Sequence, residues 1–145
     1  MSIDKKFGLI RAWSATDAAA HDGARLREGL LDKTNAASAV WADTAYRSKA
    51  NEDFMAKEFM AKNGFVSKVH RKKPKNRPMP DATRRANALK SKTRSHVEHV
   101  FAVQKDKMGL FIRTIGIARA TMKIGMANLV YNLKRTLFLR RSVPA

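Results

Sequence analysis

The spacing of hydrophobic residues predicts a β-hairpin and then a helix in the first part of the chain. Residues 8–16 are rich in apolar and β-favouring side chains, and the polar stretch at residues 4–8 before them is typical of a turn. Residues 22–35 then show apolar positions at a helical spacing, which are Leu26, Leu30 and Leu31. We therefore expect two strands followed by a helix.

Two short apolar runs and a capped helix follow. Residues 38–43 and residues 65–70 are predicted strands, and the helix between them begins after Ser48, a favourable N-cap residue. Asn63-Gly64 is typical of the carboxyl end of a helix. The apolar positions of this helix are Phe54, Met55, Phe59 and Met60. The pattern thus predicts a strand, a helix and another strand.

The last part of the chain is predicted to be helical. Residues 81–108 form one long helix, Gly109 breaks it, and residues 117–139 form a second helix. The broad apolar side of the second helix consists of Ile117, Met122, Met126, Leu129, Leu133 and Leu137. The order ββαβαβ followed by two helices, without internal repeats, indicates one mixed α/β domain over residues 1–145.

The charge of the chain points to a polyanionic partner. Lys and Arg number 30 against 12 Asp and Glu, which gives a net charge of +18. Residues 1–67 carry 10 basic and 9 acidic side chains, residues 68–94 carry 11 and 1, and residues 95–145 carry 9 and 2. This distribution favours nucleic acid, bound by the second half, over a small acidic substrate. A membrane surface is the weaker alternative.

Residues 68–80, called the basic loop below, hold three of the four prolines and are predicted to be exposed and irregular. Clustered Lys and Arg neutralise DNA phosphates without reading bases. A solvated loop without a partner is the alternative interpretation. The candidate DNA-binding residues in and after the loop are Lys72, Lys73, Lys75, Arg77, Arg84 and Arg85.

The absence of cysteine limits the chemistry. Without thiols the chain has no disulfide and no thiolate metal site, so a metal would depend on oxygen or imidazole ligands, which favours hard cations. No apolar run reaches the roughly 18 residues of a transmembrane helix, and the amino terminus is charged where a signal peptide is apolar. We therefore expect a cytoplasmic protein without membrane contact.

Two carboxylates from distant segments suggest a divalent metal site. On a helix, Arg94, Glu98, Phe101 and Lys105 lie within about 60° of one another, so one carboxylate lies between two cations. Asp43 stands at the end of an apolar run. The alternatives are a surface ion pair for Glu98 and a helix N-terminal charge for Asp43.

Four motifs along the chain carry a resemblance to a known family. In chain order they are Thr16 to Gly23, Val40 to Ser48, Ser91 to Phe101 and Asn128 to Leu133. Together they resemble the DDE transposases of bacterial insertion sequences, in particular the group typified by insertion sequence five. The resemblance covers nearly the whole chain in the correct order.

The resemblance implies a ribonuclease-H-like fold, with a mixed sheet flanked by helices and three carboxylates that hold two Mg²⁺ ions. Asp43 and Glu98 match the second and third carboxylates. Arg94 and Lys105 match the helical signature of the family, in which Ser91 stands where a tyrosine is usual. We expect Arg94 and Lys105 to bind phosphates beside the metal, and charges on a solvated helix face are the alternative interpretation.

Further expectations follow from the resemblance. No residue matches the first catalytic aspartate, so the chain resembles the carboxy-terminal part of the catalytic domain, without its first strand. We expect it not to nick DNA by itself, and expect its unpaired strand edges to promote self-association. Tyr46 and Arg47, which follow the Asp43 strand, are expected to position a DNA end, and ordinary packing and capping are the alternative interpretation.

The function implied by the resemblance is DNA transposition, by Mg²⁺-dependent cleavage and transfer of DNA strands. The partners would be double-stranded DNA at the ends of the element and a second copy or a full-length transposase. The alternative is a non-catalytic basic DNA-binding protein that interferes with full-length transposase. A ribosomal type of RNA-binding protein would explain the charge but not the ordered acidic motifs.

Overall fold

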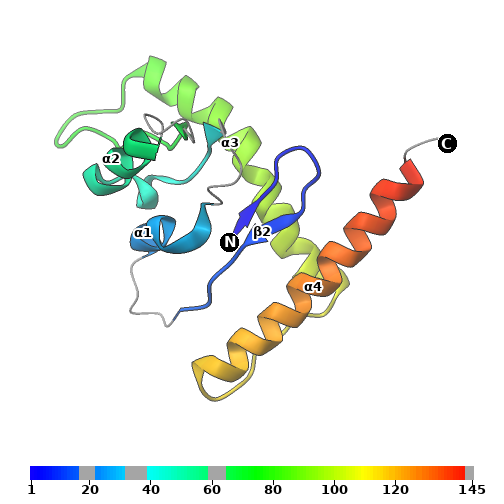
Figure 1. Cartoon of the computed structure of the whole chain (residues 1–145). Helices are drawn as coiled ribbons and strands as arrows, with labels where there is room; N and C mark the ends of the chain where they lie inside the picture. Colours follow the sequence, from blue (N-terminus) through cyan, green and yellow to red (C-terminus); the bar gives the residue numbers. More distant parts are fainter. Residues whose placement is uncertain (17–21, 32–38, 59–64, 143–145) are drawn as a thin grey trace. The chain divides into compact units, whose positions relative to one another are not determined.

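The structure is a computed structural model that describes residues 1–16, 22–31, 39–58 and 65–142. It confirms the mixed α/β class and the predicted order of elements. The chain divides into two compact units, residues 1–20 with 96–145 and residues 21–95. The elements (Figure 1) are β1 (Ser2–Ile3), β2 (Ile10–Ala12), α1 (Asp22–Arg25), η1 (Leu26–Leu30), β3 (Ala39–Val40), η2 (Thr44–Tyr46), α2 (Lys49–Glu58), β4 (Val66–Ser67), α3 (Asp81–Ala102), η4 (Val103–Lys107) and α4 (Ile117–Ser142).

The predicted hairpin at the amino terminus is confirmed, with shorter strands than expected. β1 and β2 pair antiparallel, and a register irregularity interrupts the ladder. The Asp4 carboxylate accepts hydrogen bonds from the Lys6 and Phe7 amides at 2.6 and 3.0 Å, which stabilises the turn. Gly8 completes the turn at φ +69°, a conformation that L side chains rarely adopt.

Helix α4 covers the edge of β2 with side-chain hydrogen bonds. Asn132 Oδ1 accepts from the Ile10 amide at 2.9 Å, and Asn132 Nδ2 donates to the Ile10 carbonyl at 3.0 Å. Tyr131 Oη donates to the Gly8 carbonyl at 3.1 Å, and Arg135 Nε donates to the Phe7 carbonyl at 2.7 Å. One helix thus satisfies backbone groups that a neighbouring strand would otherwise bind.

In the other unit, β3 and β4 form a parallel pair. The pairing continues beyond the strands, since the Lys68 amide donates to the Val40 carbonyl at 2.8 Å and the His70 amide to the Ala42 carbonyl at 3.0 Å. This extension accounts for most of the predicted strands at 38–43 and 65–70. The core beside the pair consists of Leu26, Met55, Phe65 and Val69.

Asn51 connects three elements of this unit. It is fully buried, and its Nδ2 donates to the Gly23 carbonyl at 2.8 Å and to the Tyr46 carbonyl at 2.7 Å. Its own amide donates to Ser48 Oγ at 3.2 Å, which confirms Ser48 as the cap of α2. The start of α2 is therefore tied to α1 and to η2.

The predicted helices differ from the structure mainly at their ends. The first ends at Leu30 because Gly29 adopts φ +109°, and the rest of the predicted 22–35 segment lies almost wholly outside the described residues. The predicted Asn63-Gly64 end of α2, with Phe59 and Met60, also lies outside them. α3 with η4 confirms the long helix, and Gly109 (φ +59°) ends it.

The mixed sheet that we expected is not formed among the described residues. β1 and β2 make one two-stranded antiparallel sheet, and β3 and β4 make a separate two-stranded parallel sheet. The four strands are two or three residues long. Among the described residues, no third strand joins either sheet. The sheets belong to different units.

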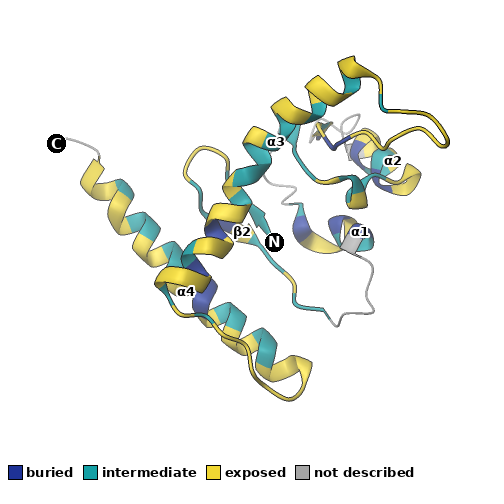
Figure 2. Ribbon diagram, turned by 180° about the vertical axis from the view of Figure 1, so that it is seen from behind, coloured by how far each residue is buried: buried dark blue, intermediate teal, exposed yellow. Residues whose placement is uncertain are grey.

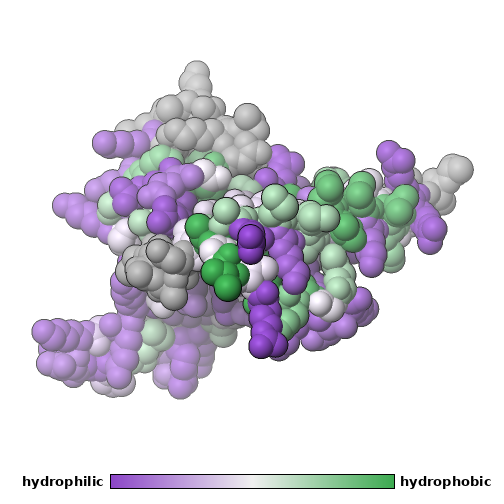
Figure 3. Space-filling view, turned by 90° about the horizontal axis from the view of Figure 1, so that it is seen from below, coloured by the Kyte–Doolittle hydropathy of each residue, from purple (hydrophilic) through white to green (hydrophobic). Residues whose placement is uncertain are grey.

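The apolar side predicted for the last helix is present and largely exposed. α4 is buried only at Ala127 and Asn128 (Figure 2). Figure 3 shows a strip of hydrophobic surface that runs along α4 towards the carboxy terminus, with hydrophilic side chains beside it. The exposed apolar residues include Met122, Met126, Leu129, Leu133 and Leu137. No helix among the described residues is long and apolar enough to cross a membrane.

Candidate functional site

Asp43 stands three residues after the end of β3, where it caps the 3₁₀ turn η2. Its Oδ1 accepts from the Thr44 amide at 2.5 Å and from the Thr44 hydroxyl at 3.2 Å. The hydrogen bond from the Thr44 backbone, followed by that from the Thr44 hydroxyl and the charge of Arg94, holds the pKa of Asp43 below its ordinary value of 3.8 against the opposing effect of burial. Asp43 is therefore ionised at neutral pH, and its role as a cap is confirmed.

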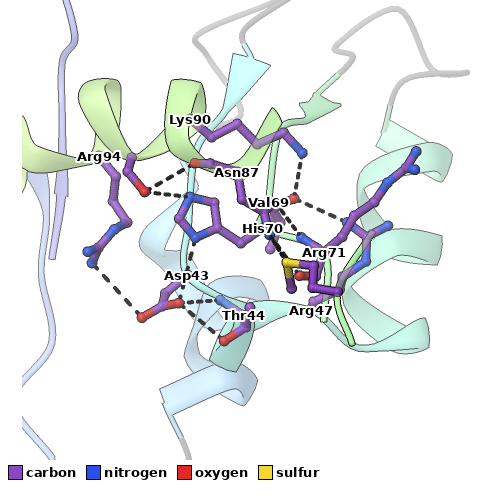
Figure 4. Close-up of polar contacts among 11 residues, drawn as sticks. Asp43, Thr44, Arg47, Val69, His70, Arg71, Asn87, Lys90 and Arg94 are labelled. Atoms are coloured by element: carbon purple, nitrogen blue, oxygen red, sulfur yellow. Dashed lines mark hydrogen bonds and ion pairs between the residues drawn. The ribbon is translucent and has the colours of Figure 1, made fainter. Parts of the chain in front are cut away.

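The parallel pairing of β3 with β4 brings His70 beside Asp43. The carboxyl ends of parallel strands meet at one edge, and His70 Nδ1 lies 3.9 Å from Asp43 Oδ1. Arg94, on α3, places Nη1 4.0 Å from Asp43 Oδ2. Figure 4 shows His70 and Arg94 both directed towards Asp43. One carboxylate thus lies beside an imidazole and a guanidinium.

His70 is a buried imidazole, 8% exposed. Burial lowers its pKa below the ordinary 6.5, the Asp43 carboxylate opposes this shift, and the charges of Arg94 and Lys90 add to it. The ring is therefore neutral at pH 7. Its contact with Asp43 is therefore not an ion pair, and at 3.9 Å it is too long for a hydrogen bond.

Ser91, His70 and Asp43 stand in the order of a hydrolytic triad, but the geometry does not favour that chemistry. Ser91 Oγ lies 3.4 Å from His70 Nε2 and also donates to the Asn87 carbonyl at 3.1 Å, a common contact within a helix. With a long contact at each nitrogen, His70 is not placed to activate the hydroxyl. We read the arrangement as a packed, neutral histidine.

The Val69 carbonyl binds two cations. Arg47 Nη1 donates to it at 3.1 Å, and Lys90 Nζ donates at 3.0 Å. Burial lowers the pKa of Lys90, and the positive charges of Arg47, Arg71 and Lys68 lower it further. Cationic side chains are therefore crowded at the start of the basic loop.

The free energy of unfolding is expected to fall as the pH drops below about 6.5, the ordinary pKa of histidine. Because burial lowers the pKa of folded His70, the unfolded chain takes up the proton at a higher pH, so protonation favours unfolding. Asp43, whose folded pKa lies below 3.8, loses its own stabilisation only when the pH falls further, through that value and below. Urea unfolding between pH 5 and pH 8 measures the effect of His70.

The matched comparison uses His70→Gln and His96→Gln, since His96 is exposed. The first substitution should flatten the dependence of the unfolding free energy on pH, and the second should leave it unchanged. A slope that survives His70→Gln would assign the titration to another group.

The basic loop is irregular, as predicted, and its residues are exposed from 71 to 80 apart from the half-buried Met79, whereas Val69 and His70 at its start are buried. It runs as an extended segment from the end of β4 into α3 (Figure 1). Arg84, in the first turn of α3, pairs with Asp81 at 2.9 Å, with both side chains more than 70% exposed, so that the pair leaves its charge accessible. The candidate phosphate-binding residues that the structure places at the surface are Lys72, Lys73, Lys75, Arg77, Arg84 and Arg85.

Tyr46 and Arg47 are more constrained than the sequence suggested. Tyr46 packs against the core cluster, which supports the alternative of ordinary packing. Arg47 contacts the Val69 carbonyl and lies 3.7 Å from the Glu52 carboxylate, which also accepts a hydrogen bond from Ser67. Their contact with a DNA end stays a prediction.

Glu98 and Lys105 belong to the other unit and are exposed. Glu98 follows Arg94 by one turn of the continuous helix α3, as predicted. The pairing of Asp43 with Glu98 stays a prediction. His96 and His99 are exposed, and among the described residues no three His, Asp or Glu side chains are grouped so that they hold a metal ion.

Asp43 fits a metal ion in part. Both of its hydrogen bonds are accepted by Oδ1, and Oδ2 is directed towards Arg94. A carboxylate oxygen of this kind suits Mg²⁺, which requires several oxygen ligands. The cluster around Asp43 offers one carboxylate and the imidazole of His70, a ligand type that Mg²⁺ does not prefer. Further carboxylate ligands must therefore come from outside this cluster.

Three residues that were not predicted from the sequence contact Asp43 or the backbone of the basic loop: His70, Asn87 and Lys90. One signal was present for His70, because it ends the predicted strand at 65–70. If that strand runs parallel to the Asp43 strand, their carboxyl ends meet. For Asn87 and Lys90 the sequence offers no comparable signal, since their partners are backbone atoms.

The transposase DDE domain family matches residues 1–133, a span that includes Asp43, His70, the basic loop and all of α3. Comparisons with curated proteins and with solved structures gave no match. The matched span is most of the chain. The chain therefore belongs to the transposase DDE domain family, whose activity is DNA transposition.

Proposed function

We propose that the protein serves the cleavage and transfer of DNA strands, through a ribonuclease-H-like catalytic domain in which Asp43 and Glu98 bind divalent metal ions. The observation that carries the proposal is the Asp43 carboxylate. This carboxylate is ionised, follows the first strand of a parallel pair and lies beside Arg94. Arg94 precedes Glu98 by one turn of α3. Membership of the transposase DDE domain family supports this assignment.

Asp43 and Glu98 are proposed as ligands of Mg²⁺. Bound in such a site, metal ions activate an attacking water or 3′-hydroxyl and stabilise the leaving oxygen of a phosphodiester. The protein's own contribution at Asp43 is to keep this carboxylate ionised and oriented, because Thr44 holds Oδ1 through two hydrogen bonds. Oδ2 accepts neither of these bonds, lies 4.0 Å from Arg94 Nη1, and is the oxygen proposed to bind the metal ion.

Arg94 and Lys105 are proposed to bind phosphate near the metal. Arg94 Nη1 lies 4.0 Å from Asp43 Oδ2, so a phosphate held by this guanidinium would stand next to the carboxylate. Lys105 follows Glu98 along the same side of the predicted helix. We also propose that Tyr46 and Arg47 position a DNA end. Tyr46 packs against the core cluster at the same time, and Arg47 binds the Val69 carbonyl.

Binding of Mn²⁺, a paramagnetic substitute for Mg²⁺, is expected to depend on both carboxylates. Asp43→Asn or Glu98→Gln should each weaken binding by about tenfold or more, because each removes an anionic oxygen ligand. The measurement is titration with Mn²⁺ while the broadening of amide NMR signals is followed, with Thr44 and Glu98 as reporters. Asp53→Asn, an exposed acidic control on α2, should leave binding unchanged.

The proposed metal site fails if Mn²⁺ broadens the signals of Thr44 without those around Glu98, or if Asp43→Asn binds Mn²⁺ as the unchanged chain does. Neither readout requires DNA cleavage, so the test applies even to a chain with no activity of its own.

Double-stranded DNA at the ends of a mobile element is the proposed substrate, and the basic loop with the start of α3 is the proposed contact surface. A second candidate function, a non-catalytic DNA-binding protein that interferes with full-length transposase, is favoured by one observation. The exposed cations of the basic loop do not contact Asp43. Under this alternative, Asp43→Asn and Glu98→Gln leave DNA binding unchanged and no metal binding is found.

A further inference from the structure

One side chain of α3, that of Asn87, contacts the basic loop near both of its ends. Asn87 Oδ1 accepts a hydrogen bond from the Arg71 amide at 3.0 Å, and Asn87 Nδ2 donates to the Arg71 carbonyl at 3.0 Å. The same Nδ2 lies 3.8 Å from Met79 Sδ, a weak contact with the other end of the loop. Figure 4 shows the Asn87 side chain extended from α3 towards Arg71.

The two bonds to Arg71 fix the backbone of the loop and not only a side chain. An amide that binds the N–H and the C=O of one residue replaces the pair of hydrogen bonds that a neighbouring strand would make. Further contacts hold both ends, since Lys90 donates to the Val69 carbonyl at 3.0 Å and the Arg84 amide to the Pro80 carbonyl at 2.9 Å. Between these ends the loop is exposed and makes no regular structure.

We infer that Asn87 is a positioning residue for DNA binding, which holds the basic loop closed so that its cations meet duplex phosphates at a fixed spacing. The inference rests on the proposed function, in which this loop contacts DNA. Asn87 itself carries no charge and contributes nothing to counterion release. It acts by removing the conformational entropy that an open loop would lose on binding.

A fixed array of cations should discriminate between forms of DNA. A duplex holds its phosphates at a set spacing, so a loop that must first be ordered binds it less well. A flexible single strand adapts its phosphates to a mobile loop as well as to a fixed one. Loss of the Asn87 contacts should therefore weaken duplex binding more than single-strand binding.

The experiment compares the unchanged full chain with Asn87→Ala. Alanine is a better helix former than asparagine, so α3 should persist, and the net charge is the same. The matched control carries Asn87→Ala together with Ala88→Asn, which returns the amide to α3 one residue further on, about 100° around the helix. Asn87→Gln, which keeps both amide groups on a longer side chain, is measured alongside as the conservative variant.

Limited trypsin digestion reports on the loop without DNA. Trypsin cleaves after Arg71, Lys72 and Lys75, whereas the bonds that precede Pro74 and Pro78 resist it. We expect cleavage at the susceptible bonds to be about tenfold faster in Asn87→Ala and in the Ala88→Asn control, because the loop opens more often. Asn87→Gln should lie between them and the unchanged chain. Far-UV circular dichroism confirms that each variant is folded.

Fluorescence anisotropy with a labelled duplex and with one of its strands gives the second readout. The duplex affinity of Asn87→Ala should fall by about tenfold, and single-strand affinity by less than about twofold. Faster cleavage with an unchanged ratio of the two affinities would overturn the positioning role, as would a folded Asn87→Ala chain that is cleaved no faster than the original.

A separate variant distinguishes this inference from the proposed function. If alanine at Lys72, Lys73, Lys75 and Arg77 leaves duplex binding unchanged, the loop is not the DNA surface and both conclusions fall. If that variant loses affinity while Asn87→Ala does not, the DNA surface stands and only the role of Asn87 is overturned.

Discussion

Alanine at Lys72, Lys73, Lys75 and Arg77 will weaken binding to duplex DNA by about 10² to 10³ at low salt, and the plot of log affinity against log salt will flatten by up to about 3.6. The physical reason is counterion release, since each phosphate neutralised on B-DNA contributes about 0.9 to that slope. These side chains lie together on an exposed loop. The measurement is a series of titrations of labelled duplex DNA with the protein at salt concentrations between about 50 and 200 mM, a range over which such slopes are resolved.

The control removes the same charge elsewhere. Alanine at Lys5, Lys6, Lys49 and Lys57, all exposed and all within the near-neutral first part of the chain, lowers the net charge by the same amount. Its slope should stay close to that of the unchanged chain. Equal losses in the two variants would contradict a local surface and assign DNA binding to the overall charge of the protein.

The second large effect is expected at Asn51, where substitution by leucine should lower the free energy of unfolding by about 2–4 kcal/mol. Leucine has a similar volume but cannot donate, so the Gly23 and Tyr46 carbonyls lose the bonds that Asn51 Nδ2 gives them at 2.8 and 2.7 Å. Thermal unfolding and urea unfolding measure the loss.

Lys49→Ala, an exposed change in the first turn of the same helix, is the control and should stay within about 0.5 kcal/mol of the unchanged chain. Because Asn51 also binds the backbone of η2, which begins after Asp43, the leucine variant should weaken Mn²⁺ binding even where the chain remains folded. Unchanged stability in Asn51→Leu would mean that water replaces the lost donor.

The elements of this fold could be predicted from the sequence where their signals are local. Ser48 caps α2 with its own hydroxyl, and Gly109 ends the long helix because it takes up a positive φ, so both boundaries depend on residues within a few positions. The spacing of Arg94 and Glu98 likewise follows from helix geometry alone. Propensity and periodicity contain this information.

The contacts that build the site could not be predicted in the same way. His70 reaches Asp43 only because β3 and β4 run parallel, and a short apolar run does not state the direction or partner of its strand. Asn87 binds the backbone of Arg71, and any residue except proline at position 71 would offer the same groups. A hydrogen bond to the backbone requires no complementary side chain at the partner position, so the sequence does not reveal it.

The dependence of the hairpin on α4 has a consequence during protein synthesis. Asn132 follows Ile10 by 122 residues, and its amide satisfies the backbone of that edge strand. At about 5–20 residues per second, the hairpin leaves the ribosome roughly 6 to 24 s before the helix that covers it. Throughout that interval the edge of β2 is open to other nascent chains, so a chaperone that occupies it would protect the protein until translation reaches α4.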